Sequence, residues 1–251
     1  MDRTISTVWR WLKNTVSFYT LLLAPHRDSV RAFTTGKPVV VLLCGWGGTR
    51  HTMSVLERRL ARDGMAPYAF PLGGALGRFN TKGIDDLAFG LMRHLSSMAM
   101  SHPEMRVAIV GHSMGGLIGR AVVTICGGAS RVHTLVTLGT PHRGSPLADT
   151  ARRTPLSRYS KALGQMVSGS AFLRKLQSAP IPGEVYCASI FSRSDHYCPP
   201  PAAEIEIPPG RDNVVNVDAG RIGHVEFVVN EETYELILRE LRTGLARTGL
   251  A

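Results

Sequence analysis

Ser113 stands in a sequence pattern that suits a nucleophile. It is the central residue of the G-x-S-x-G segment 111–115, which follows the apolar run 107–110 and precedes the helical pattern 114–126. A sharp turn between a strand and a helix exposes the serine hydroxyl at the positive end of the helix. A chance match in a chain with 26 glycines is the alternative, and the flanking strand and helix argue against it. We expect Ser113 to attack an acyl carbonyl.

A serine hydroxyl needs a base, and the base needs an acid that orients it. Around a turn of this type the chain order is serine, acid, histidine. His224 lies in the glycine-flanked loop 220–224, just before the last helical pattern, and is the predicted base. Asp195 follows an apolar strand pattern and is the predicted acid. Asp212 and Asp218 compete for this role, but each is more typical of a turn or a surface.

Three other histidines follow Ser113 in the chain, and we expect none of them to be the base. His133 opens a strand pattern and is predicted to be structural. His142 comes too early for the expected order of the three groups. His196, beside the predicted acid, is expected on the surface of a loop.

The negative oxygen of an acyl-transfer intermediate needs two backbone N–H donors. One donor belongs to the residue after the nucleophile, which is Met114, and the other belongs to the loop after the first buried strand. That loop is 44–48, with the letters CGWGG, so the N–H of Trp46 is the candidate. The indole of Trp46 is equally suited to forming a plain wall of the acyl pocket.

Apolar runs alternate with helical patterns along most of the chain. The runs expected to be strands are 38–44, 66–71, 106–110, 132–138, 184–191 and 214–217. The helical patterns are 52–63, 85–101, 114–126 and 231–242. This alternation predicts a mostly parallel sheet with helices on both faces and with active groups at the carboxyl ends of the strands. Residues 149–183, polar and loop-rich with helical pieces, interrupt the alternation as an insertion.

Residues 1–24 form a separate amphipathic pattern. Apolar side chains recur at helical spacing, while Arg3, Arg10 and Lys13 fall largely on the other side. The segment lacks a convincing cleavable signal, and its charges oppose a transmembrane helix. Two predictions stay open: an interfacial anchor on a membrane, or a helix packed on the protein's own core. These features favour a cytoplasmic or peripheral membrane location.

Composition predicts one globular domain over 25–251 and narrows its partners. The 251 residues are 44% hydrophobic and carry a formal net charge of +10. This charge suits an anionic membrane or a solvated basic surface, and the absence of basic runs interleaved with aromatics disfavours nucleic acid. The four cysteines lack a CxxC pair, so buried free thiols are expected. A Cys187–Cys198 disulfide stays open for an oxidising compartment.

These motifs resemble those of bacterial lipases and esterases of the α/β-hydrolase superfamily, including relatives grouped with the inositol deacylases of glycolipid anchors. The resemblance covers roughly 38–243 and rests on the segments GHSMGG (111–116), LGTPHRGSPLA (138–148), SGSAFLRKL (168–176), the Asp195 segment and GRIGHVEF (220–227). It implies a catalytic triad of Ser113, Asp195 and His224. It also implies an oxyanion hole from Trp46 and Met114, and a small lid at 149–183.

One position departs from this family pattern. Such lipases usually carry His-Gly at the start of the oxyanion loop, where this chain has Cys44-Gly45. The chain also has little room for the two antiparallel strands that open larger members of the fold, so a minimal sheet is expected.

The expected reaction is hydrolysis of a lipid or other apolar acyl ester through an acyl-enzyme on Ser113, with no metal or organic cofactor. An acyltransferase or a phospholipase with the same triad is the alternative among enzymes. A catalytically silent binding module is the alternative from another class. A silent module would show a broken triad, whereas every member is present here.

Overall fold

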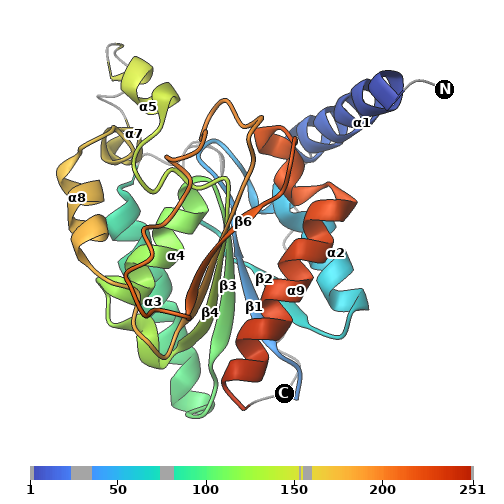
Figure 1. Cartoon of the computed structure of the whole chain (residues 1–251). Helices are drawn as coiled ribbons and strands as arrows, with labels where there is room; N and C mark the ends of the chain where they lie inside the picture. Colours follow the sequence, from blue (N-terminus) through green and yellow to red (C-terminus); the bar gives the residue numbers. More distant parts are fainter. Residues whose placement is uncertain (1–2, 24–35, 74–81, 153, 155–159, 250–251) are drawn as a thin grey trace.

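The structure is a computed structural model, and it describes residues 3–23, 36–73, 82–152, 154 and 160–249 (Figure 1). Six strands form one sheet in the order β2-β1-β3-β4-β5-β6, and every neighbouring pair is parallel. The strands are β1 (Val39–Leu43), β2 (Ala66–Ala69), β3 (Val107–His112), β4 (Val132–Leu138), β5 (Tyr186–Phe191) and β6 (Val214–Asp218). The parallel sheet expected from the apolar runs is therefore confirmed.

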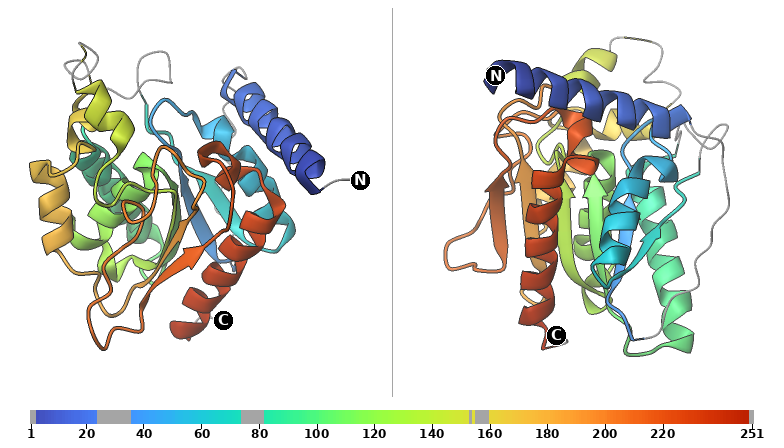
Figure 2. Two further views of the ribbon diagram at one scale, coloured as in Figure 1. Left: turned by 45° about the horizontal axis from the view of Figure 1, so that its top comes forward. Right: turned by 90° about the vertical axis from the view of Figure 1, so that its right-hand side faces the viewer.

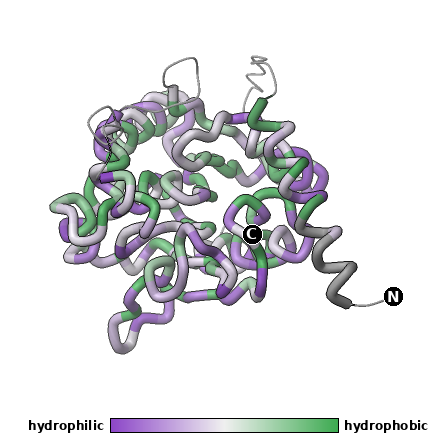
Figure 3. The backbone as a smooth tube through the Cα atoms, turned by 90° about the horizontal axis from the view of Figure 1, so that it is seen from above, coloured by the Kyte–Doolittle hydropathy of each residue, from purple (hydrophilic) through white to green (hydrophobic). Residues whose placement is uncertain are grey.

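Helices cover both faces of this sheet, as predicted. The longer ones are α2 (Ser54–Arg62), α3 (Ile84–Ser101), α4 (Met114–Thr124), α8 (Ala171–Ser178) and α9 (Glu231–Arg247). Helices α3, α4 and α8 lie on one face, and α2 and α9 on the other (Figure 1). Seen from above, hydrophobic segments occur in the middle of the molecule, and the outer helices alternate hydrophobic and hydrophilic segments (Figure 3). Strands β1, β3, β4 and β5 are buried along their whole length because helices cover both of their faces.

Helix α9 continues five residues beyond the predicted end at 242. Its added turns pack on the sheet at Gly244, where a Cβ atom would lie 2.1 Å from Oγ1 of Thr134. The last turns of α9 thus pack closely on the sheet, where the helix contacts β4 and β5.

The strand order reverses between β1 and β3. The chain runs from β1 outward to β2 and then returns across β1 to β3. The register pairs Leu43 with Gly111, and His112 with Leu138, so β1, β3 and β4 end at one level. The loops that follow these strands consequently meet at the carboxyl edge of the sheet, where ligands bind in folds of this kind.

Short helices occupy the described part of the predicted insertion. They are α5 (Pro146–Ala151) and α7 (Lys161–Gln165), followed by α8. Helix α5 begins at Pro146, earlier than the expected boundary at 149, because proline suits the first position of a helix. Residues 153 and 155–159 of the predicted lid lie outside the described residues. Three short 3-10 helices complete the described elements: η1 (Arg50–Met53), η2 (Gly128–Ser130) and η3 (His224–Val228).

Helix α1 (Arg3–Leu23) lies across the end of the domain that holds the carboxyl edge of the sheet (Figure 2). It contacts η1 and η3, and Phe18 is buried in the main hydrophobic core. The amide of Asn14 donates to Oε1 of Glu226 at 2.9 Å. One face of the helix thus packs on the protein's own core, one of the two alternatives left open by the sequence. None of the described helices is long and apolar enough to cross a membrane.

Candidate active site

Ser113 is the single residue between the end of β3 and the start of α4. Its φ of 53° makes it the one non-glycine with positive φ among the described residues, a strained conformation typical of functional sites. Its N–H donates to the carbonyl oxygen of Leu138 at 2.8 Å, which ties the turn to β4. A Cβ at Gly111 would lie 2.5 Å from the backbone of Gly115, and one at Gly115 would lie 2.3 Å from the carbonyl oxygen of Leu43. Both glycines of the motif are therefore required by close backbone contact.

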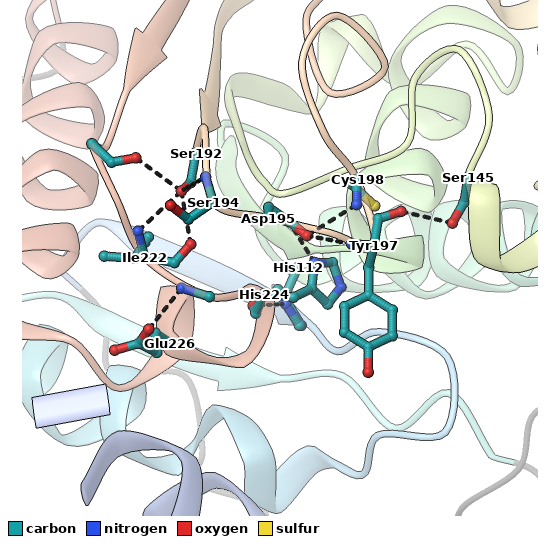
Figure 4. A network of polar contacts seen from close by, with 12 residues as sticks. His112, Ser145, Ser192, Ser194, Asp195, Tyr197, Cys198, Ile222, His224 and Glu226 are labelled. Atoms are coloured by element: carbon teal, nitrogen blue, oxygen red, sulfur yellow. Dashed lines mark hydrogen bonds and ion pairs between the residues drawn. The ribbon is translucent and has the colours of Figure 1, made fainter. Parts of the chain in front are cut away.

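The predicted acid and base are in direct contact. Asp195 is buried, and its Oδ2 accepts a hydrogen bond from Nδ1 of His224 at 2.7 Å (Figure 4). Its Oδ1 accepts the backbone N–H groups of Tyr197 and Cys198, both at 2.9 Å. Because a carboxylate only accepts hydrogen bonds, the proton of the neutral His224 ring belongs on Nδ1, which leaves Nε2 as the basic atom.

A second serine joins the acid loop to the base loop. Oγ of Ser192 lies 2.7 Å from the carbonyl oxygen of Ile222 and accepts the N–H of the same residue at 3.0 Å (Figure 4). The carboxylate of Glu226, two residues after His224, accepts the N–H of Gly223 at 2.6 Å. These bonds fix the backbone of the two residues that precede His224, and the bond to Asp195 orients its ring.

His112, the residue before Ser113, contacts the same loop. It is buried at the end of β3, and its Nε2 lies 2.9 Å from the carbonyl oxygen of His224. Burial, with a smaller contribution from neighbouring His224, lowers the pKa of His112 to about 3, so the ring is neutral at ordinary pH. The carbonyl can only accept, so Nε2 of His112 carries the proton. Sequence reasoning missed this contact, although His112 is part of the serine motif.

Ser113 and His224 open into one cavity of about 320 Å³. Most of its wall is apolar, and the side chains come from α1, α5, α7 and the loops at the carboxyl edge of the sheet. The apolar wall includes Phe18, Leu22, Leu147, Leu163, Met166 and Val225. The indole of Trp46 also lines the cavity and donates to Oγ of Ser160 at 3.1 Å. The cavity therefore suits an apolar acyl group placed against the serine.

The two predicted oxyanion donors flank Ser113. Met114 opens α4, where the first N–H groups of a helix have no partner within the helix. Trp46 lies in the loop after β1, and a Cβ at the preceding Gly45 would lie 3.0 Å from Cβ of Ser113. Cys44, which replaces the usual histidine, is buried, and burial raises the pKa of its thiol to about 12. Its neutral side chain points into the core, so the loop keeps its close approach to the serine.

The competing acids lie in ion pairs elsewhere. Asp212 is 2.8 Å from Nη2 of Arg247, and Asp218 is 2.7 Å from Nε of Arg193. Each is thus a surface group, as the sequence suggested.

Two of the other downstream histidines, His133 and His196, occupy the predicted settings. His133 is buried, with Nδ1 2.7 Å from Oγ1 of Thr134. His142 is buried with Nε2 3.0 Å from Oγ1 of Thr137, and His196 is exposed.

All four cysteines are free, so the disulfide left open for Cys187 and Cys198 does not form. Cys187 faces the main core from β5, whereas Cys198 packs in a small separate cluster with Phe191 and Ala203. Among the described residues, ligand atoms of Asp195, Cys198 and His224 lie within 4.8 Å of one another. Both carboxylate oxygens of Asp195 already accept hydrogen bonds, and burial raises the pKa of the Cys198 thiol, so this cluster favours hydrogen bonding over metal binding.

Known structures share this architecture. A lipase from Bacillus licheniformis in its mature form superposes with a TM-score of 0.65 at 16% identity, over 84% of this chain and 95% of the lipase. A monoacylglycerol lipase from Paleococcus ferrophilus gives a TM-score of 0.59 at 18% identity, over 84% and 96% of the two chains. The chain has the α/β-hydrolase fold. Its sheet is a minimal one, as expected.

Sequence comparisons find a family model that matches part of the chain, and they find a lipase among its relatives. Residues 87–168 of this chain match the family model described as a PGAP1-like alpha/beta domain, a segment that includes Ser113. A triacylglycerol lipase from Burkholderia plantarii is 24% identical over 168 residues, which cover 60% of this chain and 46% of the lipase. The chain thus spans less than half the length of that relative, and it is similar to lipases and esterases.

Proposed function

We propose that this α/β-hydrolase cleaves carboxylic esters of lipids or other apolar acyl groups through an acyl-enzyme on Ser113. The observation that carries the proposal is the 2.7 Å bond between Asp195 and His224, beside a strained serine that opens into the same apolar cavity as the histidine. Such a bond fixes the imidazole in the tautomer that acts as a base. The similarity to lipases and esterases supports the same reaction class.

The reaction proceeds in two acyl transfers. Nε2 of His224 takes the hydroxyl proton of Ser113 while Oγ attacks the ester carbonyl carbon. The backbone N–H groups of Trp46 and Met114 hold the negative oxygen of the tetrahedral intermediate. The ester C–O bond then breaks, and the leaving alcohol takes the proton from His224. A water molecule, deprotonated by the same ring, attacks the acyl-enzyme and releases the carboxylic acid and the free serine.

Turnover of p-nitrophenyl esters tests this proposal. Ser113→Ala removes the nucleophile, and we expect kcat to fall by at least about 1,000-fold. Ser101→Ala, at the exposed end of α3, is the matched control and should retain full activity. Retained turnover in pure Ser113→Ala protein would contradict the assignment. Measuring products in the presence of a competing alcohol separates hydrolysis from acyl transfer.

A further inference from the structure

Helix α1 exposes a stripe of large apolar side chains on the face opposite its packed side. We call these residues the outer stripe: Trp9, Leu12, Val16, Tyr19 and Leu23. Their exposed fractions run from 42% to 68%, and they follow one another at alternating spacings of three and four residues. This spacing places them on one side of a helix, whereas Phe18 points the other way into the core. A contiguous exposed stripe of this kind marks an interaction surface.

The outer stripe is continuous with the mouth of the active-site cavity. Tyr19 belongs to the stripe and also lines the cavity. Leu147 on α5 and Tyr197 in the acid loop are likewise both exposed and part of the cavity wall. Helices α1 and α5 lie at the same end of the molecule (Figure 2). An apolar surface thus extends from the helix to the opening that leads to Ser113.

The charge of α1 points to the chemistry of the partner. The helix contains Arg3, Arg10 and Lys13 and no acidic residue, and the side chain of Lys13 is exposed. The whole chain, α1 included, carries a formal net charge of +10. Basic residues beside an apolar helical face, with tryptophan and tyrosine in that face, are typical of helices that lie in the interface of an anionic membrane.

A second copy of the chain fits this surface less well. Pairing two α1 helices along their outer stripes would leave the exposed Lys13 of each copy without an acidic residue of α1 to pair with. Such a pair would also place each helix across the opening beside Tyr19 and so hinder substrate entry. The surface of an anionic bilayer complements both the positive charge of α1 and the apolar outer stripe. Its lipids also place acyl chains at the mouth of the cavity.

We infer that the outer stripe docks this protein on the surface of an anionic phospholipid bilayer, with the active-site cavity opening toward the acyl chains. The role of the cavity in this inference rests on the proposed ester hydrolysis. The docking itself requires no turnover.

Vesicle co-sedimentation of the full chain carrying Ser113→Ala measures docking without catalysis. The vesicles are phosphatidylcholine alone, or an equimolar mixture of phosphatidylcholine and phosphatidylserine. We expect stronger binding to the anionic vesicles, by about fivefold for each cation that reaches the surface. Adding Leu12→Glu with Val16→Glu should weaken binding by at least about tenfold. The control pair Phe89→Glu with Met100→Glu makes the same chemical change at exposed positions of α3 and should bind as before.

Several results would overturn the inference. The first is that the protein binds neither kind of vesicle. The second is that the stripe pair and the control pair lose vesicle binding equally. The third is a dimer, detected by sedimentation equilibrium, that the stripe pair of substitutions dissociates. With Ser113 intact, the stripe pair should keep full turnover of a water-soluble ester. Loss of that turnover would mean that the stripe acts as cavity wall and not as a lipid contact. Vesicle binding combined with no ester turnover by the unaltered chain supports docking and contradicts the proposed function alone.

Discussion

Nε2 of His112 lies 2.9 Å from the backbone carbonyl oxygen of His224, so the residue before Ser113 holds the loop of the proposed base. The two residues are 112 positions apart in the chain. Because Oδ2 of Asp195 also binds His224, the ring is oriented through its side chain and its backbone. We therefore propose that His112 positions His224 for the proposed reaction.

Replacing His112 tests this positioning role. His112→Phe removes the donor and leaves the carbonyl oxygen of His224 without it, and we expect kcat to fall by about 10- to 100-fold with KM little changed. His112→Gln retains an N–H donor and should recover part of the loss. His133→Gln, a buried histidine away from the cavity, is the control and should keep full kcat. Equal losses in the Phe and Gln variants would contradict a role for the hydrogen bond.

Asp195→Asn should impair catalysis without unfolding the protein. An amide in place of the carboxylate no longer favours the tautomer with the proton on Nδ1, and we expect kcat to fall by about 1,000- to 10,000-fold. Asp218→Asn, at the ion pair with Arg193, is the matched control and should keep its activity. Activity measurements on both variants, with circular dichroism to confirm folding, decide between Asp195 and the competing acid.

The buried histidines predict a loss of stability in mild acid. Burial lowers the pKa of His112 to about 3 and that of His133 to about 4, and it also lowers the pKa of His142. The unfolded chain takes up these protons near pH 6.5, whereas the folded protein does not. These histidines therefore do not lower the free energy of unfolding above pH 6.5. Below that pH the free energy of unfolding falls, and it continues to fall as the pH drops toward the pKa values of the folded protein.

Between neutral pH and pH 5, the unfolded chain binds a proton at His112 and another at His133. Each of these protons should lower the free energy of unfolding by about 2 kcal/mol. Urea unfolding at both pH values measures the change. In His133→Gln, the free energy of unfolding should fall less between neutral pH and pH 5, because the contribution of one histidine is removed. An unchanged pH dependence in that variant would show that the pKa of His133 is not lowered by burial.

Substitutions at Gly115 and Gly90 form a matched pair that tests the close packing behind the serine turn. A Cβ at Gly115 would lie 2.3 Å from the carbonyl oxygen of Leu43, whereas one at Gly90 in α3 would meet nothing within 4 Å. Gly115→Ala should therefore displace the turn, abolish turnover and lower the free energy of unfolding by about 2 kcal/mol or more. Gly90→Ala should raise it by about 0.5–1 kcal/mol, because alanine favours the helix. Thermal unfolding compares the two variants, and a stable, active Gly115→Ala protein would contradict the packing.

Much of the sheet and the contact between the predicted acid and base could be predicted because both depend on local patterns. Buried strands read as continuous apolar runs, and Ser113, Asp195 and His224 each occupy a loop at the carboxyl edge of the sheet. The bond from His112 to His224 could not be predicted, because it joins distant segments through a buried ring. The amphipathic pattern of α1 revealed a helix, but not that Phe18 would enter the core and line the cavity. Packing partners across the fold leave no local signal.

The central claim is that Ser113 carries the acyl group during turnover, and trapping the acyl-enzyme tests it most directly. The protein is mixed with a p-nitrophenyl ester, quenched in acid within the first turnover, digested and analysed by mass spectrometry. We predict that the peptide containing Ser113 gains the mass of the acyl group, and that Ser113→Ala gains none. Rapid ester turnover with the acyl group on another residue, or with the Ser113 peptide unmodified, would contradict the account.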